Sequence, residues 1–304
     1  MKQTNKALLY MHIATFLFGM TAIIGKLISL NEFNMVWHRM LITSFVFLLI
    51  PAFWKNIHKI PKKILGIFFL NGVIVAIHWV TFYGSIKVNN NASLTLACFG
   101  SVSAMAAVLE PLILKQKFKK SELILGLIVL IGLAFIAFAD SNSSFSLGSK
   151  YFQAIVLALI SSFFAVVFTI INKKYIQEYN PMVVTWAQMT GGFLFLTLMI
   201  PLVLHNSIPF QSIPSAIDGL WLVILAVACT NIAFSLEMES LKNMSAFTSS
   251  IILNLEPVYG IFVAIFLFKE NELLNEWFYV GTLIVIISVF AHAYFNRKQQ
   301  RLIK

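Results

Sequence analysis

The segment SAFTSSIILNLEPVYGIFVAIFLF, which spans residues 245–268, decides the class of fold. Among its 24 residues only Glu256 carries a charge, and most of the others are apolar. A helix of about 20 such residues is long enough to cross the hydrocarbon core of a bilayer. The segment therefore predicts a membrane-spanning helix with one acidic side chain near its middle.

The composition of the whole chain agrees with this prediction. Hydrophobic residues make up 59% of the 304 and charged residues 11%, whereas soluble domains carry roughly a quarter charged residues. A net charge of +10 in a soluble protein would suggest nucleic acid as a partner. Here the basic residues lie in short tracts between apolar runs, which is typical of the cytoplasmic face of a membrane protein.

Ten apolar runs are long enough to be spans: residues 7–28, 35–54, 64–85, 92–114, 122–139, 152–172, 182–204, 217–236, 245–268 and 277–295. Their length favours helices, because the strands of a membrane barrel have about ten residues and alternate in polarity. The first run is too long for the core of a signal peptide, so we expect it to be a retained span.

The distribution of basic residues predicts the topology. Alternation from a cytoplasmic N-terminus places seventeen of the 22 lysines and arginines on the cytoplasmic side and three, Lys87, Lys150 and Lys269, on the other. The remaining two, Lys26 and Arg39, lie within spans. Because positive residues accumulate on the cytoplasmic side, we predict a multi-pass protein of the bacterial inner membrane with both termini in the cytoplasm.

An internal repeat divides the spans into two sets of five. Residues 85–87 (Ser-Ile-Lys) match residues 240–242 (Ser-Leu-Lys), and Gly126 matches Gly281 at the same offset of 155. Because five is odd, the second copy must enter the membrane from the opposite side, as in many secondary transporters. We predict an all-α membrane fold of two inverted five-helix repeats, residues 1–139 and 152–304, with an extracytoplasmic linker, 140–151, between them and a short cytoplasmic tail.

The second repeat carries a recognisable set of residues: Ser240-Leu241-Lys242, Ser245-Ala246, Leu255-Glu256-Pro257-Val258, Glu270 and Gly281. This set, with the ten-span layout of nearly the whole chain, resembles the EamA-type members of the drug/metabolite transporter superfamily. The resemblance implies transport of amino acids, amines or related metabolites, often outward, through a cavity formed mainly by spans one, three, four, six, eight and nine. The first repeat departs from the pattern, since Val102 stands at the position of Pro257 and Lys115 at that of Glu270.

Glu256 is the clearest candidate for function, because a charged side chain at the bilayer centre costs at least about 2.5–3.5 kcal/mol. Pro257 deprives the carbonyl of Leu253 of its helical amide partner and favours a kink. A carboxyl beside a broken helix suits a substrate or proton site. The alternative is a structural carboxyl that joins the two halves.

Span three carries a polar face. Asn71, His78 and Phe82 lie on one side of the predicted helix, and Trp79 and Tyr83 flank it. This face suits a cavity for a flat or amphipathic solute. The alternative is hydrogen bonding between helices, with the two flanking aromatics at the membrane interface.

Span eight carries a second polar stripe that includes Asn231 and Ser235, while Glu237 and Glu239 lie near its cytoplasmic end, where a solvated position is expected. Arg39 is expected to reach toward the outer interface or to meet an acidic partner or an anionic solute. The predicted substrate site contains Asn71, His78, Trp79, Phe82, Tyr83, Asn231, Ser235, Asn254 and Glu256.

Enzyme signatures are missing from the sequence: it has no G-x-G-x-x-G, no P-loop and no H-E-x-x-H motif. Cys98 and Cys229 lie inside apolar runs and are expected to act as small apolar residues. We therefore predict a secondary transporter, an exporter that works by alternating access, with a small solute, the bilayer and protons as candidate partners. No cofactor, metal or nucleic acid is expected. The alternatives are a membrane enzyme acting on a lipid or lipid-linked substrate and a passive channel.

Overall fold

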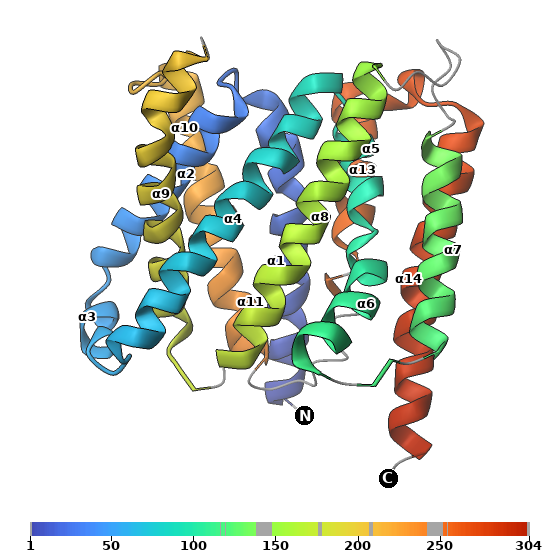
Figure 1. The fold of residues 1–304 in the computed structure, drawn as a ribbon, viewed down its shortest axis with the longest axis horizontal. Helices are drawn as coiled ribbons and strands as arrows, with labels where there is room; N and C mark the ends of the chain where they lie inside the picture. Colours follow the sequence, from blue (N-terminus) through green and yellow to red (C-terminus); the bar gives the residue numbers. More distant parts are fainter. Residues whose placement is uncertain are drawn as a thin grey trace.

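The computed structural model describes residues 2–115, 117–118, 120–137, 148–175, 178–206, 209–241, 252–253 and 255–302. These residues are almost entirely helical, and none of them lies in a strand. The long helices run side by side in one bundle, and both chain termini lie at the same end of it (Figure 1).

The first half of the chain contains α1 (Lys2–Leu27), α2 (Glu32–Leu48), α3 (Pro51–Ile57), α4 (Lys62–Asn89), α5 (Ala92–Phe99), α6 (Val102–Leu114) and α7 (Lys120–Ala137). The second half contains α8 (Lys150–Tyr175), α9 (Pro181–His205), α10 (Ala216–Ala226), the π-helical turn η1 (Val227–Ile232), α11 (Ala233–Leu241), α13 (Glu256–Phe268), the 3-10 turn η2 (Glu270–Leu273) and α14 (Glu276–Leu302).

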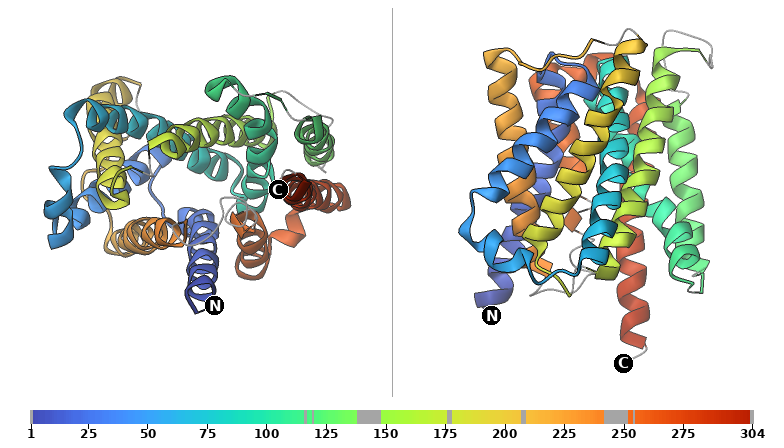
Figure 2. Two further views of the ribbon diagram at one scale, coloured as in Figure 1. Left: turned by 90° about the horizontal axis from the view of Figure 1, so that it is seen from below. Right: turned by 60° about the vertical axis from the view of Figure 1, so that its left-hand side comes forward.

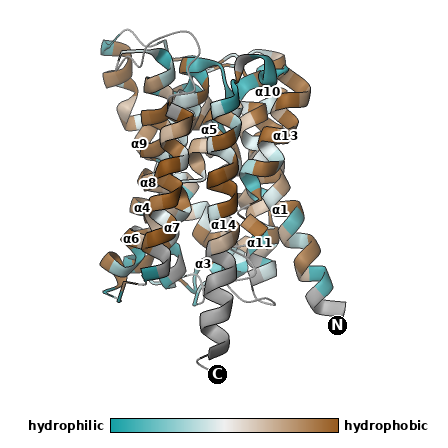
Figure 3. Ribbon diagram, turned by 90° about the vertical axis from the view of Figure 1, so that its right-hand side faces the viewer, coloured by the Kyte–Doolittle hydropathy of each residue, from teal (hydrophilic) through white to brown (hydrophobic). Residues whose placement is uncertain are grey.

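The outside of the bundle is apolar, as a lipid-facing surface must be. Large side chains such as Leu70, Leu198 and Phe266 are more than two-thirds exposed. Hydrophobic residues cover most of the helix lengths, and hydrophilic ones gather at the two ends of the bundle (Figure 3). The chain is thus a multi-pass membrane protein.

Among the described residues, six helices are long and apolar enough to cross a membrane, and the pair α2 and α3, bent by 88°, can count as a seventh. Three shorter apolar helices cover Leu123–Ile136, Glu256–Phe268 and Glu276–Ser288. Each of these elements overlaps a different one of the ten predicted spans, and the three shorter helices cover only part of theirs.

The two halves interlock. Helices of the first half pack chiefly on helices of the second: α1 on α11 and α13, α4 on α8 and α9, α5 on α8 and α13, and α7 on α14. Figure 2 shows the last of these pairs at one edge of the bundle, seen from below. Exchanging each span for its counterpart in the other half turns each of these contacts into another observed one, since the α4–α9 contact becomes that of α2 with α10 and η1. The α4–α8 contact, for example, becomes the α11–α1 contact.

Span four is interrupted, and a helix begins within span nine. Gly100 and Ser101 separate α5 from α6, and α13 begins at Glu256 with Pro257 in its first turn. Proline is well tolerated there, since the first amides of a helix have no carbonyl partner. Pro257 therefore starts a helix here and does not kink the interior of one.

Candidate functional site

Arg39 lies inside the bundle. It extends from α2 and is 2% exposed. The face of Trp79 covers its guanidinium, with 3.7 Å between the Cζ atom and the ring centroid. Its Nη1 donates to the Tyr83 hydroxyl at 2.6 Å, Nε to Thr230 Oγ1 at 3.0 Å, and Nη2 to the Cys229 carbonyl oxygen at 3.4 Å. The prediction that Arg39 reaches the outer interface is therefore wrong, because every one of these partners is inside the protein.

Two local features build this arrangement. Thr230 and Cys229 belong to η1, where the Thr230 hydroxyl also donates to the Leu225 carbonyl oxygen, five residues earlier. Such π-helical turns are rare and occur often at functional sites. Gly25 on α1 lies directly against the Tyr83 ring, so any Cβ at position 25 would overlap that ring.

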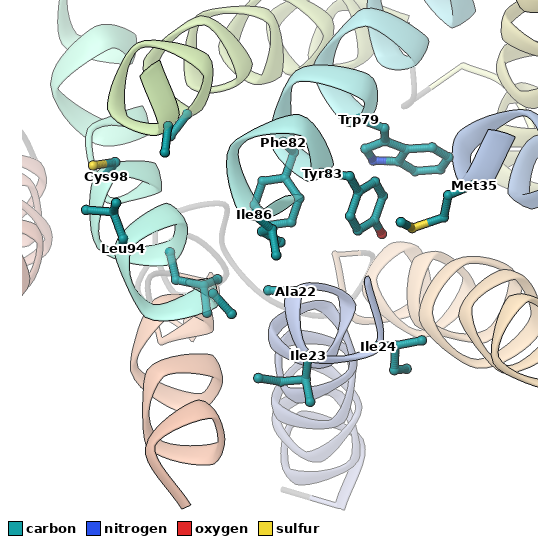
Figure 4. Close-up of a cluster of buried hydrophobic side chains, with 14 of the residues drawn as sticks. Ala22, Ile23, Ile24, Met35, Trp79, Phe82, Tyr83, Ile86, Leu94 and Cys98 are labelled. Atoms are coloured by element: carbon teal, nitrogen blue, oxygen red, sulfur yellow. The ribbon is translucent and has the colours of Figure 1, made fainter. Parts of the chain in front are cut away.

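Figure 4 shows Trp79 and Tyr83 projecting from α4 toward Met35 of α2. Both aromatic side chains are buried. Together with Arg39 and Thr230, they bring parts of three spans into one polar cluster inside the bundle.

Two buried polar atoms beside Arg39 are unsatisfied. Thr43 lies one turn further along α2, and the Asn231 side-chain amide donates to its carbonyl oxygen at 3.3 Å. Thr43 Oγ1 and Asn231 Oδ1 have no hydrogen-bond partner among the residues that the structure describes. Since buried polar atoms are normally paired, these two indicate a place for a polar group from outside the chain.

Glu256 supplies the acidic side of the site. Its carboxyl group is within electrostatic range of Glu237 on α11 and of Arg39. The first span approaches it closely, since a Cβ on Gly19 would lie 2.9 Å from the carbonyl oxygen of Glu256. Glu256 thus lies within electrostatic range of both the Arg39 cluster and Glu237 on α11.

Asn71 and His78 form hydrogen bonds with residues of another helix. The Asn71 amide donates to Asn172 Oδ1 at 3.1 Å, and His78 Nδ1 lies 2.8 Å from Ser161 Oγ; both of these partners are on α8. The Phe82 ring packs near the rings of His78 and Phe99. These contacts correspond to the alternative interpretation of the span-three face, in which its polar groups join helices.

Two other residues of the predicted site, Ser235 and Asn254, are not placed in the cluster. The Ser235 hydroxyl donates to the Asn231 carbonyl oxygen at 2.6 Å, and the Ser235 side chain is exposed. Asn254 lies outside the described residues. The structure thus brings together Trp79, Tyr83 and Asn231 and adds residues that were absent from the predicted site: Arg39, Thr43 and Thr230. Their sequence signals are the charge of Arg39 inside a span and the i, i+4 spacing of Arg39 and Thr43 on one face of span two.

No three His, Cys, Asp or Glu side chains within the described ranges lie close enough together to hold a metal ion. Chemically, the cluster offers recognition of charge and hydrogen bonds, and a carboxyl group that can exchange protons.

Comparisons with known proteins agree with this description. The model of the EamA-like transporter family matches residues 5–138 and 152–293. A protein of Buchnera aphidicola subsp. Schizaphis graminum (strain Sg), named an uncharacterized transporter, is 25% identical over 206 residues, which are 66% of this chain and 66% of that protein. A solved structure, titled only as the crystal structure of a protein, superposes with a TM-score of 0.60 at 12% identity and covers 93% of this chain and 95% of its own. That structure is evidence for the fold alone.

Proposed function

The chain belongs to the EamA-like transporter family, part of the drug/metabolite transporter superfamily, and we propose that it is a secondary transporter that moves a small metabolite out of the cell. The solute is an amino acid, an amine or a related amphipathic compound. The observation that carries this proposal is the buried cluster around Arg39, where α2 and α4 of the first half meet η1 of the second. Rocking of the two halves would expose such a site to either side in turn.

The proposed architecture has ten membrane crossings in two inverted repeats, residues 1–139 and 152–304, joined by the linker 140–151. The symmetric pairing of helices between the halves supports the inversion. The positions of the apolar helices support the count.

We expect both termini to face the cytoplasm and the linker to face the outside of the inner membrane. Single cysteines at positions 144 and 299, in a protein whose buried Cys98 and Cys229 are replaced by alanine, should react differently with a membrane-impermeant maleimide on intact cells. Position 144 should be labelled at once and position 299 only after permeabilisation. Equal labelling of both would contradict the topology.

The transport activity itself is tested by flux into proteoliposomes. Trp79→Leu should lower solute flux by about tenfold or more, because it removes the aromatic face that covers the Arg39 guanidinium, and a buried cation–π contact is worth about 2 kcal/mol. Trp277→Leu is the matched control, since Trp277 lies on α14 and is 48% exposed. Equal solute flux in the two variants would contradict the assignment of Trp79 to the substrate site.

The same assay separates transport from its alternatives. A transporter gives saturable flux and counterflow, whereas a passive channel gives neither. A lipid-modifying enzyme would leave the solute where it was and change the lipid.

A further inference from the structure

Among the described residues no carboxylate is in direct contact with Arg39, and Glu256 acts on its charge only from further away. Within the part of the chain that the structure describes, the ion pair found within 4.0 Å is that of Lys26 with Glu270, and no carboxylate comes that near to Arg39. The three acceptors around the guanidinium, on Tyr83, Thr230 and Cys229, are all neutral. A buried charge of this kind is costly and normally finds a partner.

The guanidinium also has spare hydrogen-bond donors. It carries five N–H groups, and three of them are used by the acceptors named above. One N–H on each terminal nitrogen is left without an acceptor among the described residues. Trp79 stacks on the face of the group and so leaves its edge available. A planar fork with two free donors matches the two oxygens of a carboxylate.

Thr43 supplies an independent indication of a ligand. Its hydroxyl is fully buried, lies one turn from Arg39 on the same face of α2, and has no partner in the described ranges. Such a hydroxyl can donate to an anionic oxygen. The unpartnered Oδ1 of the neighbouring Asn231 can accept from a donor group next to that anion.

From these contacts we propose that Arg39 and Thr43 bind the carboxylate of the transported solute, so that the protein selects organic acids over amines and amides. This inference rests on the proposed transport function and narrows its class of solutes. Binding of a carboxylate gives the Arg39 charge a negative partner, which lowers the electrostatic cost of keeping that charge buried while the site changes orientation. The surrounding rings of Trp79 and Tyr83 favour an acid with an apolar body.

The test uses the purified full-length protein and two matched sets of probes: phenylalanine, phenylalaninamide and phenethylamine, and leucine, leucinamide and isoamylamine. Binding is followed by calorimetry and by the tryptophan fluorescence that Trp79 contributes. The acids should bind, and their amides and amines should bind at least about tenfold more weakly. Arg39→Lys should weaken acid binding by about tenfold, because lysine keeps the charge and loses the planar fork.

Thr43→Val keeps the test decisive even if changes at Arg39 impair folding. It removes a hydroxyl that has no partner in the described structure, so stability should be unchanged while acid binding weakens by about threefold to tenfold. Thr282→Val is the matched control. It removes another buried, unpartnered hydroxyl, on α14, which packs against α7, and acid binding should be unchanged.

The proposal is overturned if no acid of the two sets binds, if the amides or amines bind as well as the acids, or if Thr43→Val binds acids like the wild type. Flux in proteoliposomes separates this failure from failure of the function. If the amines are transported, the protein is a transporter but the proposed carboxylate site is wrong. If the acids bind but no probe is transported, the carboxylate site stands and the proposed transport function is wrong.

Discussion

Replacing Glu270 by leucine is expected to lower the free energy of unfolding by about 3–5 kcal/mol, the cost of breaking a buried ion pair from one side. Glu270 is fully buried between α13 and α14. Its Oε1 accepts from Lys26 Nζ at 2.7 Å and from the amide of Ala92 at 2.9 Å, and its Oε2 accepts from the amide of Ser93 at 2.8 Å. One carboxylate therefore ties the end of α1 to the start of α5.

The reciprocal change, Lys26→Met, should cost less, about 1–3 kcal/mol, because Glu270 would keep two backbone amides as partners. Loss of Glu270 instead leaves a partly buried ammonium and two buried backbone amides without this acceptor. Chemical unfolding in detergent measures both variants. Glu272→Leu, in the same turn but exposed, is the control and should stay within about 0.5 kcal/mol of wild type. If Lys26→Met lowered the free energy of unfolding more than Glu270→Leu does, the Glu270 carboxylate would not be the centre of this contact.

The second large effect is expected from Glu256→Gln, which should abolish the pH dependence of net transport while preserving the fold and solute binding. Glu256 begins α13 and is within electrostatic range of Glu237 and Arg39. A carboxyl in this setting is suited to take up and release a proton during the cycle. Glutamine has the same shape as the protonated acid and cannot exchange that proton.

Flux in proteoliposomes across mildly acidic to mildly alkaline pH is the measurement. Glu239→Gln is the control, since Glu239 is an exposed acid on α11, and it should keep the wild-type profile. Wild-type flux and an unchanged profile in the Glu256→Gln protein would assign that carboxyl a structural role only.

Helix positions were predictable where one long run of apolar residues makes one helix. The predicted span 64–85 lies within α4. Span two was harder, because α3 starts at Pro51 and turns by 88° from α2, and hydropathy carries no information on direction. The interruption of span four at Gly100 and Ser101 occurs without a proline, and a Gly-Ser pair is a weaker signal for a break than a proline.

The site was predictable only in part, for a similar reason. The sequence identified Trp79 and Tyr83 as aromatic residues beside a polar face, and both lie in the buried cluster. It could not identify their partner, because Arg39 and Thr230 are 191 positions apart and meet only once the halves interlock. The sequence gives the depth of a residue in the membrane but not the helix that lies across from it.

The interlocking of the halves has a consequence for synthesis of the protein on the ribosome. The main partners of α4 are α8 and α9, and α8 begins at Lys150, long after α4 ends at Asn89. At roughly 5–20 residues per second, α4 waits several seconds in the membrane before α8 is made. During that wait the polar groups of Asn71 and His78 face lipid or a chaperone. A chain that stops after the first repeat would keep them unpaired, and we expect such a fragment to be less stable in the membrane than the full chain.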